Sequence, residues 1–442
     1  MAGVTGGAVD ASRRLGAARL AVGLLQGLAL YGLHRAFHLR AWPATDAPLF
    51  GALALAFAFA PLVLLAGLGH LRWLTLTVWT VVAAIAVGLF AAHAVASALP
   101  RPWPLIVAPF PVWAFAAAAL FCAHHLIVPA DAERRLVAPY PAYFDAAWLD
   151  GVRLALAIAF TGAFWLLLTL GAALFGLIGL KGFGDVIHRP GFYFPALGLM
   201  FAAAVQLADT RAGLTRGLRT VALVLLSWLL PVMGAIAVAF LIALPFTGLA
   251  VLWRAGSATG ILLGSIGALV VLINAAYQDG AQEAVVPAVL RWAAGITAVA
   301  LVPLAGVAVW GLALRMGQHG LTPSRIVAAA AAAVAVCYAL GYAFAAVRPG
   351  RWMARLEPTN IVAAVAMIVL IVALLSPIAD PSRIAAADQV ARLERGAVTP
   401  AKFDFAFLRF KAGRYGLTAL KRLAALETVA TPLRSRRWPA KP

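Results

Sequence analysis

The amino-acid sequence predicts an all-α polytopic membrane protein, with ten or eleven transmembrane helices followed by a small helical C-terminal extension. Hydrophobic residues make up 64% of the 442 residues and charged residues 12%, against roughly 45–50% and about 25% in soluble domains. Stretches of about 20 apolar residues, the length that spans a bilayer, recur from residue 17 to residue 378. This composition excludes a cytosolic enzyme, a disordered chain and a disulfide-stabilised scaffold.

Eleven apolar stretches emerge when hydrophobic windows are closed at charged residues, proline and glycine. The predicted spans are residues 17–37, 48–69, 73–97, 105–128, 152–180, 191–208, 218–243, 259–275, 289–313, 325–347 and 359–378. Two regions are less regular, because the sixth span is short and the region from Leu218 to Trp253 is interrupted by Pro231 and Pro245. Ten spans is therefore an open alternative.

The first span begins like a secretory signal peptide, since Arg13 and Arg14 precede an apolar run that starts at Ala17. A small-residue cleavage site does not follow, and the run ends in polar residues such as His34. We therefore expect the run to be retained as a membrane span, with residues 1–16 as a cytoplasmic N-terminal segment.

Two segments between spans differ from the rest in composition. Aromatic and proline residues crowd residues 139–148, which predicts a short interfacial helix before the fifth span. The glycine-rich stretch from Gly179 to Gly184 follows an apolar span instead of a strand and lacks the Lys-Ser/Thr ending of a phosphate loop. It predicts a tight or re-entrant loop. No sequence motif points to a cofactor, and we expect none.

The distribution of basic residues predicts the orientation. Before residue 379, 14 Lys and Arg residues fall in one set of alternate loops and 8 in the other, and the richer set includes the N-terminal segment. Because cytoplasmic loops carry the excess of positive charge, we expect a cytoplasmic N-terminus, and eleven spans then place the C-terminal tail in the periplasm. Only 5 of the 35 basic residues are Lys, a bias that suggests a GC-rich bacterial genome and hence a bacterial inner membrane.

The net charge of +19 does not indicate a nucleic-acid partner, because the basic residues are spread singly and in pairs over loops and tail. The lipid bilayer is the partner that the composition predicts.

Residues 379–442 form a soluble tail with 13 basic and 5 acidic residues. Three short helices are predicted in it, the first opening at Asp380 and ending at Gly396, the second opening at Thr399, and the third following Gly413. On the second helix three phenylalanines recur at i, i+4 and i+7 and so share one face. This face, a candidate surface for a protein partner, consists of Phe403, Phe407 and Phe410. The alternative is ordinary packing of a small appendage.

Ionisable side chains are scarce within the spans, and those that occur are candidates for function because they are costly at membrane depth. On the predicted topology several gather at the cytoplasmic ends of spans four, six and eight. The candidate substrate- or ion-binding residues are His124, His125, Asp209, Asn274 and Asp279. The alternative is that they cap helix ends and hydrogen-bond across the bundle. His34 and His38 share a helix face, but without a third placed ligand no metal site is assigned.

Four stretches resemble those of a known family. They are Ala147-Trp148 leading to Trp165 and Leu174-Phe-Gly-Leu-Ile-Gly179; Asn274-Ala-Ala-Tyr-Gln-Asp-Gly280; His319-Gly-Leu-Thr322; and Asp404-Phe-Ala-Phe-Leu-Arg-Phe410 with Arg414-Tyr-Gly416. On these stretches the chain, over most of its length after about residue 50, resembles the bacterial inner-membrane proteins grouped as domain-of-unknown-function family 4153. The resemblance implies a multi-span inner-membrane protein with a short soluble C-terminal extension, and it implies no activity or catalytic residue.

Three functions remain open from the sequence. The first is a carrier or permease for a small or amphiphilic substrate. The second is a membrane scaffold or signalling component that binds a partner through its C-terminal tail. The third is a membrane enzyme that acts on lipid-linked substrates, which the missing catalytic motifs make the weakest of the three.

Overall fold

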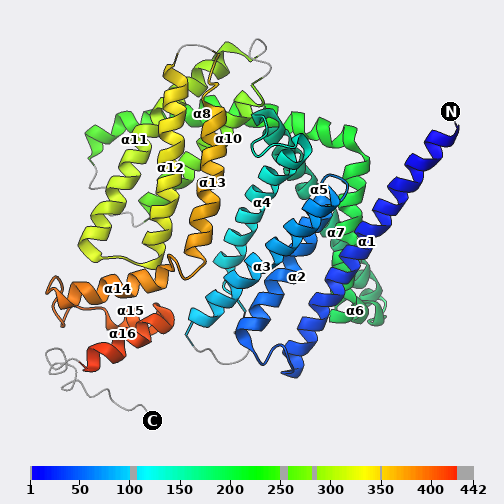
Figure 1. The fold of residues 1–442 in the computed structure, drawn as a ribbon, viewed down its shortest axis with the longest axis horizontal. Helices are drawn as coiled ribbons and strands as arrows, with labels where there is room; N and C mark the ends of the chain where they lie inside the picture. Colours follow the sequence, from blue (N-terminus) through cyan, green and yellow to red (C-terminus); the bar gives the residue numbers. More distant parts are fainter. Residues whose placement is uncertain (1, 100–106, 249–256, 281–285, 349–350, 426–442) are drawn as a thin grey trace. The chain divides into compact units, whose positions relative to one another are not determined.

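The structure, a computed structural model, describes residues 2–99, 107–248, 257–280, 286–348 and 351–425. Every regular element in these residues is a helix, and eleven of the helices are long and apolar enough to cross a membrane (Figure 1). The all-α polytopic bundle predicted from the sequence is thereby confirmed. The end of the predicted tail, residues 426–442, lies outside the described residues.

The eleven long helices overlap the eleven predicted apolar stretches, so the higher of the two expected numbers is found in the described residues. They are α1 (Ala2–Leu39), α2 (Ala47–Gly67), α3 (Trp73–Ser97), α4 (Phe110–Glu133), α5 (Tyr140–Leu177), α7 (Pro190–Thr210), α8 (Ala212–Thr247), α10 (Ala258–Tyr277), α11 (Ala288–His319), α12 (Pro323–Val347) and α13 (Leu356–Leu374). The four short helices are α6 (Gly182–Ile187), α14 (Pro381–Glu394), α15 (Phe405–Phe410) and α16 (Gly413–Ala425).

The predicted interfacial helix before the fifth span is wrong as a separate element. The aromatic segment is the first part of α5, which runs for 38 residues from Tyr140. The charged residues Asp150 and Arg153 fall inside this helix instead of ending it. They can do so because they form an ion pair with each other, with Nη1 of Arg153 2.8 Å from Oδ1 of Asp150.

The proline-containing region after Leu218 is a single helix in its described part. α8 runs for 36 residues with Pro231 and Pro245 inside it. The stretch from Gly179 to Gly184 was predicted to be a loop, and this is wrong for its second half: Gly182 to Gly184 form the start of α6, which leaves only a short turn after α5.

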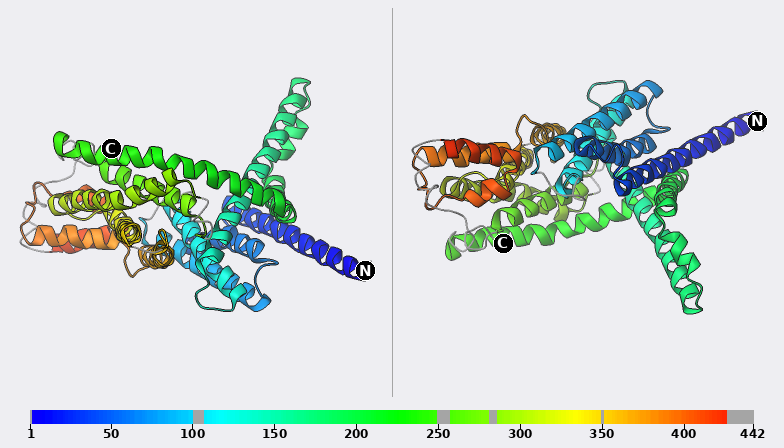
Figure 2. Two further views of the ribbon diagram at one scale, coloured as in Figure 1. Left: turned by 90° about the horizontal axis from the view of Figure 1, so that it is seen from above. Right: turned by 90° about the horizontal axis from the view of Figure 1, so that it is seen from below.

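The helices group into two compact units. The first comprises α1, α2, most of α3, α4–α7 and the start of α8; the second comprises the end of α3, the rest of α8, α10–α13 and the tail helices. In the first unit α1 lies along α7, and α7 also packs on α5. The C-terminal half of α5 projects away from the other long helices of the N-terminal part, α1, α2, α3 and α4 (Figure 2). In the second unit α12 packs on α10, α11 and α13.

Small residues allow α1 and α7 to approach closely. Gly23 and Gly27 are four residues apart on α1, and a side chain at Gly23 would collide with the backbone carbonyl of Gly198 on α7. A side chain at Gly27 would likewise meet the backbone of Phe194. Because helices pack in membranes largely through such close backbone contact, this seam fixes which residues of α1 and α7 face each other.

The tail folds as three short helices, but the second differs from the prediction. Asp404 caps α15 by accepting a hydrogen bond from the Phe407 backbone N–H at 2.9 Å, so the helix begins at Phe405 and not at Thr399. Phe403 therefore precedes the helix. Its side chain and that of Phe407 are buried in a cluster within the tail, whereas Phe410 is 63% exposed. The three phenylalanines do not form one exposed helix face.

The first tail helix begins as predicted. The Asp380 carboxylate accepts hydrogen bonds from the backbone N–H groups of Ser382 at 2.7 Å and Arg383 at 3.1 Å, which is the geometry of an N-cap. Oδ2 of the same carboxylate lies 2.7 Å from Nε2 of His93 at the end of α3. Within the second unit, the contact between Asp380 and His93 thus joins the tail to the end of α3.

Candidate functional site

Asp209, near the end of α7, is the centre of a network of charged side chains in the first unit. Its Oδ2 lies 2.8 Å from Nη1 of Arg19 on α1, and its Oδ1 lies 2.9 Å from Nη2 of Arg153 on α5. Nε2 of His70, in the turn after α2, is 3.6 Å from Oδ1. One carboxylate therefore joins three cationic or titratable side chains from different helices and loops.

Arg19 is the most deeply buried member of this network. Its side chain is 1% exposed, and it lies one turn before Gly23, where α1 and α7 make their closest approach. Nη1 donates to Oε1 of Gln206 at 2.7 Å, and Nη2 donates to the carbonyl oxygen of Leu68 at 2.8 Å. The close helix contact therefore places a guanidinium against α7 with polar partners for both terminal nitrogens.

Arg153 extends the network to α4. Besides contacting Asp209, it donates to Asp150, and Oδ2 of Asp150 lies 3.3 Å from Nε2 of His125. Nδ1 of His125 is 2.7 Å from the carbonyl oxygen of Phe121. Both ring nitrogens thus face acceptors, and the two hydrogen bonds form together only when the ring carries both protons.

His124, beside His125, has a different environment. The indole Nε1–H of Trp79 donates to Nδ1 of His124 at 3.2 Å. Because an indole nitrogen only donates, Nδ1 must be the accepting nitrogen, and in the neutral ring the proton is on Nε2. That nitrogen is buried and has no hydrogen-bond partner among the described residues. An unsatisfied buried donor is uncommon in folded proteins.

The charged network lines a cavity of about 90 Å³. Its walls are formed by Arg19, Leu62, Leu65, Ala66, His70, Asp150, Arg153, Leu154, Phe201, Val205 and Asp209. A space of this volume holds several water molecules or one small solute. Two guanidinium groups, two carboxylates and an imidazole thus surround a small space whose remaining walls are apolar.

The structure brings together some of the predicted candidates. His125 and Asp209 belong to the same network through Asp150 and Arg153, and His124 adjoins it, with its ring centroid 5.4 Å from that of His125. Arg19, Asp150 and Arg153 are not among the candidates predicted from the sequence, where basic residues served only to predict the orientation. The Gly23-Leu-Leu-Gln-Gly27 pattern was the available signal, because it marks the face of α1 that packs on another helix.

Asn274 belongs to a separate cluster in the second unit. Its Nδ2 donates to the Tyr342 hydroxyl at 2.6 Å, that hydroxyl donates to Oδ1 of Asn360 at 2.6 Å, and Nδ2 of Asn360 donates to Oδ1 of Asn274 at 2.7 Å. These three side chains close a ring of hydrogen bonds between α10, α12 and α13. Asp279 lies in the turn that follows α10, after Gln278 with φ +56°. Hydrogen bonds of this kind hold neighbouring membrane helices together, here α10, α12 and α13.

A second ion pair in the first unit has the character of a structural clamp. Arg72 donates to Oδ1 of Asp131 through Nε at 2.8 Å and to Oδ2 through its backbone N–H at 3.0 Å, and the hydroxyl of Thr75 donates to Oδ1 at 2.6 Å. The hydrogen bond to Asp131 raises the pKa of the Arg72 guanidinium. This pair joins the start of α3 to the end of α4 and takes no part in lining the cavity.

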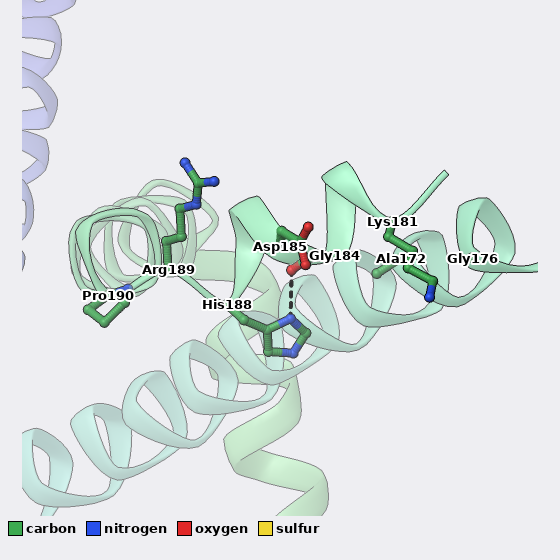
Figure 3. A pocket seen from close by; sticks show the side chains of 8 residues that line it. All are labelled: Ala172, Gly176, Lys181, Gly184, Asp185, His188, Arg189 and Pro190. Carbon is green, nitrogen blue, oxygen red and sulfur yellow. Dashed lines mark hydrogen bonds between the residues drawn. The ribbon is translucent and has the colours of Figure 1, made fainter. Parts of the chain in front are cut away.

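The loop between α5 and α7 borders an open hollow of about 570 Å³. Figure 3 shows that Lys181 and Arg189 point away from each other, so their charges do not converge on one ligand position. Nδ1 of His188 is hydrogen-bonded to the Gly184 carbonyl at 2.7 Å. This hollow is therefore a weaker candidate for a ligand-binding site than the cavity around Asp209.

His34 and His38 lie in contact, with ring centroids 4.3 Å apart. In the described part of the chain no group of three His, Cys, Asp or Glu side chains has the geometry to hold a metal ion. No residue set is therefore assigned to a metal.

Neither family models, nor curated proteins, nor solved structures match this chain. The resemblance to family 4153 therefore stays a prediction, and the function has to be inferred from the residues of the site.

Proposed function

We propose that the protein is a membrane carrier or permease for a small solute, and that the network around Asp209 binds that solute. The observation that carries the proposal is the cavity of about 90 Å³ lined by Arg19, Asp150, Arg153, Asp209 and His70. Charged groups are costly within an apolar bundle, and where they occur they commonly mark solute or ion pathways.

The ion pairs of the network support solute binding as well as contact between the helices. A carboxylate that only joins two helices needs one cationic partner, and the ion pair described for Asp131 is with Arg72. Asp209 contacts three arginine or histidine side chains, and Asp150 contacts two. Because each carboxylate has more than one partner, one partner can be exchanged for a solute while the carboxylate stays paired. A buried charge without any partner would be strongly destabilising.

The charges in the wall favour a zwitterionic solute. Two guanidinium groups can bind a carboxylate, since Arg binds such planar anions with paired hydrogen bonds. The two aspartates can bind an ammonium group. The volume limits the solute to a few non-hydrogen atoms in the conformation described, so small amino acids are the first compounds to test.

The proposal is tested by measuring the thermal stability of the purified full chain in detergent with and without a panel of small zwitterions, monocarboxylates and amines. A solute that binds the folded protein raises its Tm in a concentration-dependent way. We expect Asp209→Asn to abolish the rise, and Asp131→Asn, which removes a carboxylate of the structural clamp, to retain it. If no compound raises the Tm of the wild-type chain, or if Asp209→Asn retains the rise in full, the proposal is wrong.

The membrane and orientation belong to the same proposal. The excess of basic residues in the loop set that includes the N-terminus supports a cytoplasmic N-terminus in a bacterial inner membrane, and eleven spans then put the tail in the periplasm. Reporter fusions after residue 378 test this. Periplasmic-reporter activity supports the orientation, and activity of a cytoplasmic reporter contradicts it.

A second candidate function is a scaffold that binds a protein partner through its tail. The exposed surface available for such a partner is smaller than the predicted face of three phenylalanines. Phe403 and Phe407 are buried within the tail, which leaves Phe410, with the Arg409 guanidinium 5.5 Å from its ring centre, as the exposed aromatic. The experiment is co-purification of a partner with wild-type chain and with Phe410→Ser. Loss of a partner in the variant alone favours the scaffold, and identical co-purification removes the case for it.

A further inference from the structure

The second unit contains a positively charged hollow that the proposed carrier site does not use. It has a volume of about 340 Å³ and lies where α11 ends and α12 begins. Its lining residues are Gly311, Leu314, Arg315, Gln318, His319 and Arg325. None of them belongs to the network around Asp209. The volume is in the range of small-ligand pockets, which begins at about 300 Å³.

Three arginines gather at this end of α11. Arg315 and Arg325 line the hollow, and Arg392 of the tail helix α14 lies within electrostatic range of Arg325. Like charges held this close repel one another, so an anion bound between them would stabilise the cluster.

Part of this cluster has a structural role. Arg392 donates to the carbonyl oxygens of Gly317 and Gln318, both at 3.0 Å, and Nη1 of Arg325 donates to the carbonyl of Gly320 at 2.6 Å. Cations are favoured at a helix C-terminus, where backbone carbonyls lack partners. In the described hydrogen bonds, capping uses two of the five N–H donors of the Arg392 guanidinium and one of the five of Arg325.

Two side chains of the tail helix α14, Asp388 and Gln389, hydrogen-bond to the backbone beside the hollow. Oδ2 of Asp388 accepts the backbone N–H of Leu321 at 2.7 Å, and Nε2 of Gln389 donates to the carbonyl oxygens of His319 and Leu321 at 3.1 and 3.0 Å. These bonds fix the loop between α11 and α12. Asp388 does not line the hollow, so the wall carries two guanidinium groups and an imidazole.

The hollow is bounded by apolar residues on the side of the span. Gly311 and Leu314 belong to the last turns of α11, a helix apolar enough to cross the membrane. Arg315 lies near the end of this helix and Arg325 near the start of the next, and the ends of membrane-spanning helices generally lie near the lipid phosphate groups. The site thus presents an apolar wall beside a cationic one.

We propose that the hollow lined by Arg315 and Arg325 binds a phosphate group. A guanidinium matches phosphate geometry with paired hydrogen bonds, and the two guanidinium groups that line the hollow match the charge of a phosphate. The phosphate belongs either to an anionic phospholipid, whose acyl chains then lie along Leu314 and α11, or to a soluble phosphate compound. The same two arginines serve both.

The test measures binding to the purified full chain in detergent by the Tm rise in titrations with phosphatidylglycerol and, separately, with inorganic phosphate. We expect the wild-type chain to bind at least one of these probes. Arg315→Gln/Arg325→Gln should weaken binding by about tenfold or more, because charge-assisted hydrogen bonds are lost. The control Lys411→Gln/Arg414→Gln removes the same charge from exposed tail positions and should bind like the wild type.

The outcomes separate the two sources of phosphate. A Tm rise with phosphatidylglycerol alone assigns the site to a lipid headgroup, and a rise with inorganic phosphate as well assigns it to phosphate irrespective of the lipid. Because Arg325 also holds the Gly320 loop, the single variant Arg315→Gln repeats the test without disturbing that bond. No binding by the wild type, or equal binding by the site variants and the control, would overturn the proposal.

Discussion

Gly23 on α1 and Gly198 on α7 face each other so closely that neither position has room for a side chain, because an added Cβ at either one would collide with the backbone carbonyl of the other. This contact sets the register of the two helices. One turn earlier on α1, Arg19 meets Gln206 and Asp209 of α7. The buried ion pair thus depends on two residues that have no side chain.

Replacing Gly23 by Val should separate α1 from α7. Forcing methyl groups into a packed interface costs about 1–3 kcal/mol, so the Tm of the variant in detergent should fall by several degrees. Gly32→Ala is the matched control on the same helix, since its added Cβ meets no atom within 4 Å, and alanine is the better helix former. An unchanged Tm in Gly23→Val would contradict the close contact.

Loss of Asp209 should be more damaging than loss of Arg19. Asp209→Asn leaves the buried Arg19 guanidinium with only neutral acceptors, Gln206 and the Leu68 carbonyl, and an uncompensated buried charge costs about 3–5 kcal/mol. Arg19→Met leaves Asp209 still paired with Arg153. Thermal unfolding of both variants gives the order, and an equal or larger loss in Arg19→Met would count against the network as described.

The two roles of Asp380 can be separated by substitution. Asp380→Asn keeps the ability to cap α14, because asparagine is a good N-cap, but loses the charge that faces His93. Asp380→Ala loses both, and the missing cap should cost about 1 kcal/mol more. Limited proteolysis of the tail should therefore be fastest in the alanine variant. Equal rates in the two variants would mean that capping does not stabilise the tail.

The phenylalanines of the tail should differ in their effect on stability. Phe407 is packed in the buried tail cluster and Phe410 is exposed. Phe407→Ala should cost about 3–5 kcal/mol and increase the rate of proteolysis within residues 381–425, whereas Phe410→Ala should leave that rate unchanged. Equal sensitivity of the two variants would restore the single aromatic face that the sequence predicted.

The helices were predictable because their apolar length is a local property of the chain. Every expected stretch overlaps a helix in the described residues, since backbone polar groups have no partner in lipid other than one another. The errors fell where charge was read as a boundary. The fifth span was predicted to begin at residue 152, but α5 begins at Tyr140 and includes Asp150 and Arg153, which pair with each other inside the helix.

The candidate site was only half predictable. Composition indicates that His125 and Asp209 are unusual in an apolar bundle, but not which partners meet them. Arg19 is 187 positions from Gln206 in the chain, and only the packing of α1 on α7 brings them together. Phe403 was likewise mispredicted. Its helical spacing from Phe407 was apparent in the sequence, but Asp404 caps α15 and so leaves Phe403 outside the helix, and this cap depends on side-chain geometry.

The most direct test of the central claim is counterflow of a radiolabelled solute into proteoliposomes that contain the purified full chain, using the compound that raises its Tm most. We predict accumulation with the wild-type chain and with Asp131→Asn, and only the level of protein-free liposomes with Asp209→Asn. Accumulation by Asp209→Asn equal to the wild type, or no accumulation by the wild type, would contradict the assignment of the Asp209 network as a solute-binding site of a carrier.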